Sequence, residues 1–164
     1  MTDDAKKVMG QIDIDPRKNG GGSLRRPRGE RKYGILRLTK LGGKGGYGKS
    51  KLAAAARHNL RERDAPNARP EDRDRNIYLA GAKTAKDLMK LWEELAPEKV
   101  RTNAVHALEY VMSASPEEMA KMGHIQSEDY LRDAYAWVEE KHGVENILSA
   151  VIHMSAPAHH VQVL

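Results

Sequence analysis

Several residue types are missing or scarce in this chain of 164 residues, and each absence excludes a class of chemistry. The chain has no cysteine, which excludes disulfide bridges, thiolate metal sites and cysteine nucleophiles. It has no phenylalanine and only 5% aromatic residues, so its core must be aliphatic and rich in methionine. No apolar run approaches the ~20 residues of a membrane span, and the N-terminus lacks the apolar segment of a signal peptide. We therefore expect a cytoplasmic protein without a membrane segment.

The charge of the chain is modest in sum but unevenly distributed. Lys and Arg number 28 and Asp and Glu number 23, which gives a formal net charge of +5. Residues 1–63 carry most of the excess, whereas residues 87–145 are balanced or acidic. A basic half favours a polyanionic partner, with nucleic acid as the first candidate, although an ordinary solvated surface explains the same charge equally well.

The order of patterned segments predicts an α/β or α+β sandwich. Residues 1–32 predict a flexible basic N-terminal arm, because a glycine run and dense charge leave nothing to bury. Hydrophobic periodicity and capping residues then predict the remaining elements. These are strands at 33–38, 103–112, 146–153 and 159–164, and helices at 49–63, 84–95, from 116 onward and at 127–142.

Histidines gather at the C-terminal end of the chain. If the last two strands pair as a hairpin, strand alternation puts His160 and Gln162 on one face and His159 on the other. His153 can then join His160 across the turn. Imidazoles with a side-chain amide would form a weak site for Mn, Zn or Ni. The alternative is that these are exposed terminal histidines that bind no ion.

A second candidate site lies in the predicted helix at 49–63. His58 and Arg61 are spaced to share a helix face, so imidazole and guanidinium can address the same phosphate. Histidine can also act as a nucleophile. Taken alone, however, a basic alanine-rich helix is most simply a solvated helix.

A third pattern is the literal match of Gly43 to Ser50 to the phosphate-loop motif G-x-x-x-x-G-K-[ST], between a predicted strand and a predicted helix. A P-loop NTPase also needs a strand that ends in an acidic residue to hold magnesium. No predicted strand ends this way, and the chain is short for a doubly wound parallel sheet. Nucleotide hydrolysis is therefore the less favoured alternative.

Five segments occur in a particular order along residues 33–164. They are the strand at 33–40, the histidine segment at 57–63 with 66–68 and Asn76, the strand at 101–110, the helix start at 113–117, and the helix and strand at 137–153. Together they resemble the N-terminal catalytic region of the MobV-type (Pre/Mob) plasmid mobilisation relaxases. The resemblance implies an α+β, HUH-endonuclease-like fold, in which helices flank a central, mostly antiparallel sheet.

The resemblance also implies an activity, namely metal-dependent nicking and transfer of single-stranded DNA at an origin of transfer during conjugation. His58 matches the histidine that becomes linked to the scissile phosphate, and Glu109 matches the acid that orients it or takes its proton. A Mn²⁺ ion would be held by the histidine cluster. The positions matching DNA-binding residues are Arg37, Lys40, Arg61 and Arg101, and those matching or replacing metal ligands are His153, His159, His160 and Gln162.

The chain departs from the family pattern in its third motif, His-x-Asp-Glu-x-x-Pro-His-x-His. Ser155-Ala156 replaces the Asp-Glu pair. An ungapped alignment matches His153 and His160 and puts Gln162 at the third histidine, whereas a one-residue deletion puts His159 in place of His160. The chain also stops at Leu164, before the family sheet ends, so the domain at 33–164 is expected to be incomplete. A degenerate relaxase that binds DNA without cutting it therefore stays open as the alternative, and enzymatic activity stays undecided.

Overall fold

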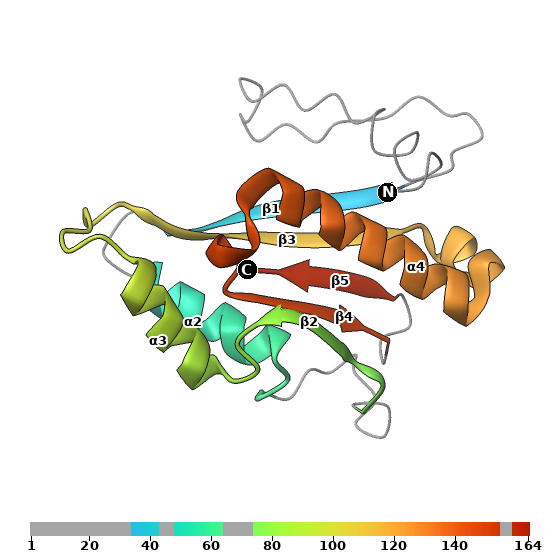
Figure 1. Ribbon diagram of the computed structural model, residues 1–164, viewed down its shortest axis with the longest axis horizontal. Coiled ribbons are helices and arrows are strands. Elements are labelled where there is room, and N and C mark those ends of the chain that lie inside the picture. The colour runs from blue at the N-terminus through green and yellow to red at the C-terminus, as the bar shows by residue number, and fades with distance from the viewer. Residues whose placement is uncertain (1–33, 43–47, 64–73, 155–158) are drawn as a thin grey trace.

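A single antiparallel sheet organises the computed structural model, which describes residues 34–42, 48–63, 74–154 and 159–164. The strand order is β1-β3-β5-β4-β2, and every neighbouring pair is antiparallel. The strands are β1 (Gly34–Gly42), β2 (Ile77–Gly81), β3 (Val105–Ala114), β4 (Ser149–His153) and β5 (His160–Val163). The helices are α2 (Gly48–Asn59), α3 (Ala85–Leu95) and α4 (Pro116–His142), followed by the short 3-10 helix η2 (Val144–Asn146). Figure 1 shows β5 in the middle of the sheet, between β3 and β4.

Strand alternation divides the sheet into two apolar faces, each covered by helices (Figure 1). One face packs against α4, and its buried side chains include Tyr110, Met112, Leu131, Ile152 and Val161. The other face packs against α2 and α3, which also contact each other, and its buried side chains include Leu41, Leu52, Leu88, Val151 and Leu164. This arrangement confirms the expected α+β fold with helices on both sides of a mostly antiparallel sheet.

Local sequence signals place the ends of the longer helices. Thr84 caps α3 by accepting a hydrogen bond from the Asp87 N–H, and Ser115 caps α4 by accepting one from the Glu118 N–H. Gly123 has φ 67° and ψ −172°, so it divides α4 into two helical segments. The sequence had likewise predicted two helices in this region.

Three predictions about local structure differ from the structure. The first strand, predicted at 33–38, continues to Gly42. The five-residue strand β2 was not predicted, because a short apolar run at the sheet edge carries no distinctive periodicity. Helix α2 ends at Asn59, earlier than the predicted 63. The arm 1–32, the loop 43–47 and the Ser155-Ala156 replacement lie outside the described residues.

The P-loop alternative disagrees with this architecture. Every neighbouring pair of described strands is antiparallel, whereas a P-loop enzyme is built on a parallel sheet. Lys49, the motif lysine, forms an ion pair with Glu93 and lies 5.3 Å from the centroid of the Trp92 ring. Its ammonium therefore ties α2 to α3. No helix among the described residues is long and apolar enough to cross a membrane.

The fold generates a prediction about helix α4. We expect Leu131→Ala to lower the free energy of unfolding by about 2–5 kcal/mol, because Leu131 is fully buried between α4 and the sheet. Ile125→Ala on the same helix is the control, since that side chain is 78% exposed and its loss should change stability by less than about 0.5 kcal/mol. Urea unfolding followed by circular dichroism measures both. Equal losses would contradict the packing of α4 described above.

Candidate functional site

Two histidines face each other across the β4–β5 hairpin. The register pairs His153 with His160, and their ring centroids lie 4.9 Å apart. Strand alternation puts both on the sheet face that α2 and α3 cover. The next cross-strand pair on that face is Val151 with Gln162. The hairpin predicted from the sequence is therefore present, and it brings His153 and His160 together.

The buried imidazole of His153 is neutral. The side chain is 0% exposed, and its pKa is lowered from 6.5 to about 2, chiefly by burial and then by His160, Arg61 and His58. The nearby Gln162 side chain raises the pKa of His153, although its contact with the ring does not have the geometry of a hydrogen bond. Among the described residues neither ring nitrogen has a hydrogen-bond partner. Burying such unpaired polar atoms costs about 1–3 kcal/mol each, so they need a functional explanation.

The orphaned atoms around His153 fit a divalent metal. A neutral imidazole offers the lone pair that Mn²⁺ or Zn²⁺ binds, and Gln162 Oε1 beside it is also buried without a partner among the described residues. Yet within the described part of the chain no group of three or more His, Asp or Glu side chains is arranged to hold an ion. The donor set is thus two imidazoles and one amide oxygen, which contains no negative charge.

His159 does not join the pair. Its ring lies 5.3 Å from that of His124 in α4, on the other side of the hairpin. Ser113 Oγ donates a 2.6 Å hydrogen bond to the His159 carbonyl and holds its backbone at the edge of β3. Of the two alignments of the third motif, the geometry therefore supports the ungapped one, with His160 rather than His159 opposite His153.

The C-terminus of α2 brings His58 and Arg61 to the same place. Both are close enough to His153 to lower its pKa. The helix ends in a Schellman motif, in which the Arg61 N–H donates to the His58 carbonyl and the Glu62 N–H donates to the Arg57 carbonyl. Arg61 occupies the left-handed position, with φ 57°, where glycine is usual. A residue held in this conformation is strained, and such strain is concentrated at functional sites.

Asn59 is the site residue that the sequence reasoning missed. Its side chain is 2% exposed, and its Nδ2 donates a 2.9 Å hydrogen bond to Glu109 Oε1 on β3. Glu62 Oε1 accepts a 2.8 Å hydrogen bond from the Ala85 N–H at the start of α3. The backbone around His58 is therefore tied to β3 on one side and to α3 on the other. A buried, poor helix-forming asparagine directly after the histidine is the signal that could have revealed it.

The sequence-predicted DNA-binding residues lie in different places. Arg37 is exposed on β1 and pairs with Val111, which in turn pairs with Gln162. It therefore shares the face of the histidine pair, with its backbone about 10 Å from that of Gln162, two strands away. Lys40 alternates to the opposite face. Arg101 lies before the start of β3, at the end far from the site. Met112, which pairs with Val161 next to His160, is ~24 Å along β3 from Val105. The structure thus groups Arg61 and Arg37 with the site, but not Lys40 or Arg101.

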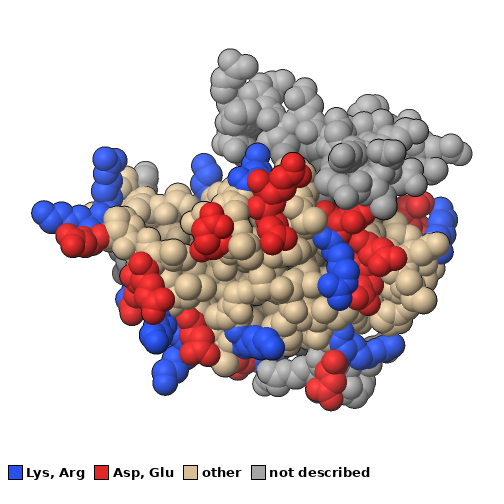
Figure 2. Space-filling view, in the orientation of Figure 1, with Lys and Arg blue, Asp and Glu red and all other residues tan. Residues whose placement is uncertain are grey.

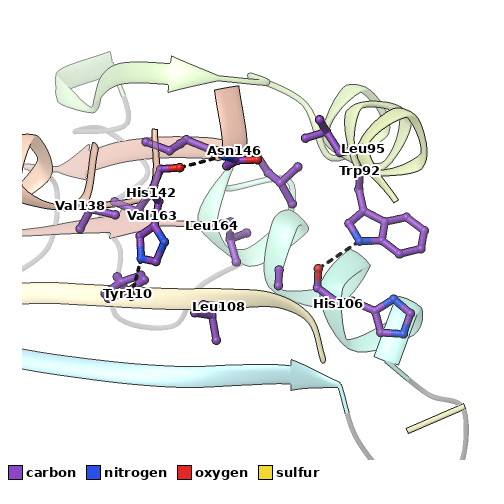
Figure 3. Close-up of a pocket in the computed structure, with 13 residues that line it drawn as sticks. Trp92, Leu95, His106, Leu108, Tyr110, Val138, His142, Asn146, Val163 and Leu164 are labelled. Atoms are coloured by element: carbon purple, nitrogen blue, oxygen red, sulfur yellow. Dashed lines mark hydrogen bonds between the residues drawn. The ribbon is translucent and has the colours of Figure 1, made fainter. Parts of the chain in front are cut away.

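A separate pocket of about 240 Å³ opens at the other end of the sheet (Figure 3). In it the Tyr110 hydroxyl lies 2.8 Å from His142 Nε2, and Trp92 Nε1 donates to the His106 carbonyl at 3.1 Å. Apolar side chains complete its lining, among them Leu95, Leu108, Val138, Val163 and Leu164. None of the sequence-predicted site residues lines this pocket, so it is distinct from the histidine site.

Comparison with solved structures identifies the class of fold. The chain superimposes with a TM-score of 0.66 and 18% identity on the MobM relaxase domain (MOBV; Mob_Pre) bound to 22 nucleotides of plasmid pMV158 oriT DNA, an Mn-bound crystal structure at pH 5.5. A second crystal structure of that domain, with a 3′-thiophosphate on the DNA, gives a TM-score of 0.67 at 18% identity. Each match covers 80% of this chain and 68% of the other. The fold is that of a relaxase domain.

The sequence itself matches a family model. The model described as plasmid recombination enzyme (Mob_Pre) covers residues 31–164. The chain therefore belongs to the plasmid recombination enzyme family, as the five ordered segments led us to expect. A search of curated proteins gives no match.

The Schellman motif generates a prediction about Arg61. We expect Arg61→Gly to be about 1 kcal/mol more stable than Arg61→Ala, because only glycine adopts φ 57° without strain. The matched control is Arg57, which is exposed in the last turn of α2. There, Arg57→Gly should be about 1 kcal/mol less stable than Arg57→Ala. Thermal unfolding of the four variants gives both differences, and differences of the same sign at both positions would contradict the left-handed conformation.

Proposed function

We propose that this chain is a plasmid mobilisation relaxase that nicks single-stranded DNA at an origin of transfer, in the cytoplasm where plasmid DNA resides. The observation that carries the proposal is the approach of His58 and Arg61, from a different element but on the same sheet face, to the pair formed by the buried His153 and the half-buried His160. Membership of the plasmid recombination enzyme family supports it. Residues 33–164 would form the catalytic region, preceded by the basic segment 1–32.

His58 is the proposed nucleophile. A lone pair on its imidazole attacks the scissile phosphorus, a P–N bond forms, and the P–O bond to the adjoining sugar breaks. The departing sugar oxygen takes a proton from water and becomes a free hydroxyl end, and the phosphorylated imidazolium releases its N–H proton to solvent. That hydroxyl, or one from another strand, can reverse the step and transfer the strand. His58 is exposed at the end of α2, so DNA can reach it without movement of the fold. Arg61 and Arg37 on the same face would bind phosphate oxygens and hold the strand in line.

Glu109 and Asn59 would position this nucleophile. Glu109 accepts the amide hydrogen of Asn59, so a carboxylate on the sheet fixes the residue next to His58. Through this link Glu109 orients His58 rather than touching the reacting atoms. It also places a negative charge near the imidazolium that forms when the phosphorus is attacked.

His153, His160 and Gln162 would hold a divalent metal, for which Mn²⁺ is the candidate because the solved MobM structures are Mn-bound. When bound, the ion would polarise a phosphate oxygen and stabilise charge in the transition state. The chain contributes neutral donors, because burial keeps His153 unprotonated, and a dry floor, because β4 is buried along its whole length. Amide oxygen is a weaker donor than imidazole for this ion.

The same donor set supports a second candidate, a relaxase fold that binds DNA without cutting it. Gln162 stands at the third metal position, and no described carboxylate completes the cluster. Cleavage of DNA in the presence of Mn²⁺ distinguishes a nicking relaxase from a fold that only binds DNA. DNA binding is common to both.

The first test is cleavage of DNA. Single-stranded oligonucleotides tiled across the DNA that flanks the coding sequence are incubated with the protein and Mn²⁺, and denaturing gels reveal nicked DNA and protein–DNA adducts. We expect an adduct with the natural chain and none with His58→Ala, whereas Arg57→Ala, one residue away, should retain it. A chain that binds an oligonucleotide tightly yet forms no adduct would establish the DNA-binding alternative.

The second test measures metal binding through stability. Mn²⁺ at ~100 times its dissociation constant should raise the free energy of unfolding by ~2.7 kcal/mol. We expect His153→Ala to abolish this response and Gln162→His to lower the dissociation constant about tenfold, since imidazole replaces the weaker amide ligand. His142→Ala is the control, because His142 contacts Tyr110 away from the site. A full response in His153→Ala would overturn the assigned ligands.

A further inference from the structure

A second cluster of nitrogen-bearing side chains lies on the opposite side of the β4–β5 hairpin from the histidine pair. Arg75 Nη2 is 3.0 Å from His124 Nε2, and the rings of His124 and His159 have centroids 5.3 Å apart. Arg75 and His124 are exposed, whereas His159 is half-buried, with its Nδ1 atom buried and without a hydrogen-bond partner among the described residues. The three side chains come from three separate elements.

The cluster is held in place by its neighbours along the chain. Asn76 Oδ1, next to Arg75, accepts a 3.2 Å hydrogen bond from the Met154 N–H at the end of β4. Ser113 Oγ fixes the His159 carbonyl. Ser127 Oγ donates a 2.5 Å hydrogen bond to the carbonyl of Gly123, the residue before His124. The backbone at or next to each member is thus held by a hydrogen bond, which lowers the entropic cost of binding a ligand.

The electrostatics of the cluster favour an anion. Arg75 supplies a guanidinium 3.0 Å from His124 Nε2, and the His159 ring lies beside that of His124, so an anion at the cluster would meet a cation and ring N–H donors. Gly123 interrupts α4, and a new helical segment begins at His124. The N-terminus of a helix carries partial positive charge and free N–H donors, which adds to the same potential.

We propose that Arg75, His124 and His159 form a phosphate subsite that binds one backbone phosphate of the DNA strand cleaved at the histidine pair. This inference rests on the proposed function. His159 and His160 are consecutive and point to opposite faces of the hairpin, so the two sites lie ~10 Å apart around its tip. That separation corresponds to a few nucleotides. The subsite would hold the DNA next to the scissile phosphate, while Arg61 beside the histidine pair binds the scissile phosphate itself.

The surroundings limit the subsite to this corner. Figure 2 shows Asp and Glu side chains over the face of the molecule that carries α4, mixed with Lys and Arg. Farther along α4, Arg132 is paired with Glu128 at 2.7 Å. Single-stranded DNA that continued along α4 would meet carboxylates, so the subsite contacts about one DNA phosphate.

The salt dependence of DNA binding tests the proposal. A fluorescent single-stranded oligothymidine is titrated in EDTA over a range of potassium chloride concentrations, with the natural chain, Arg75→Ala/His124→Ala and Arg75→Gln. For the double variant we expect a slope of log K against log salt that is smaller by ~0.7, and affinity that is about three- to tenfold weaker at low salt. Arg132→Ala is the matched control, because it removes the same formal charge from the same region.

The possible outcomes distinguish the phosphate subsite from the proposed relaxase function. A reduced slope in the double variant and in Arg75→Gln, with Arg132→Ala unchanged, supports the subsite. An unchanged slope in the Arg75 variants, or an equal reduction in Arg132→Ala, overturns the subsite and leaves the proposed function intact. Failure of the natural chain to bind the oligothymidine overturns both. The Mn²⁺ response of the double variant must equal that of the natural chain, because the two sites are separate.

Discussion

The register between β4 and β5 is the constraint on which the site depends. It sets His153 opposite His160, and a slip of one residue would turn His160 toward α4 and His159 toward α2. The apolar partners hold the register, since Val161 and Ile152 fill the core against α4 while Val151 faces α2. The imidazoles therefore take their positions from the packing of their aliphatic neighbours. A metal site with two or three weak donors can be retained only if such packing arranges them in advance.

Helix α2 must stop at a defined point for His58 to meet this pair. Its last turn is fixed by the Asn59–Glu109 hydrogen bond, by Glu62 at the start of α3, and by the left-handed conformation of Arg61. These contacts reach β3 and α3, so the position of His58 is set by the sheet and by a second helix together. Strain at Arg61 is the cost of having a guanidinium where a glycine would fit better.

Part of this arrangement could be predicted from the sequence, and the limits have physical causes. Alternation along the last strands was sufficient to bring His153 and His160 together, because period-two geometry is local. The Asn59–Glu109 contact joins residues 50 positions apart, and no local pattern encodes it. The phosphate-loop motif was rightly given little weight for the converse reason. Its spacing is local, but its function needs a parallel sheet, and in this fold Lys49 instead pairs with Glu93.

The placement of the site on the inner strands has a consequence for how such a domain can vary. β3, β5 and β4 carry Glu109 and the histidine pair, while β1 and β2 form the two edges of the sheet. Each edge strand leaves one row of backbone N–H and C=O groups unmatched by the other described strands. Strands, loops or whole modules can thus be appended at either margin without altering the distances among the reactive groups. The architecture separates the inner strands, which carry the candidate site, from two borders at which additional parts can be exchanged.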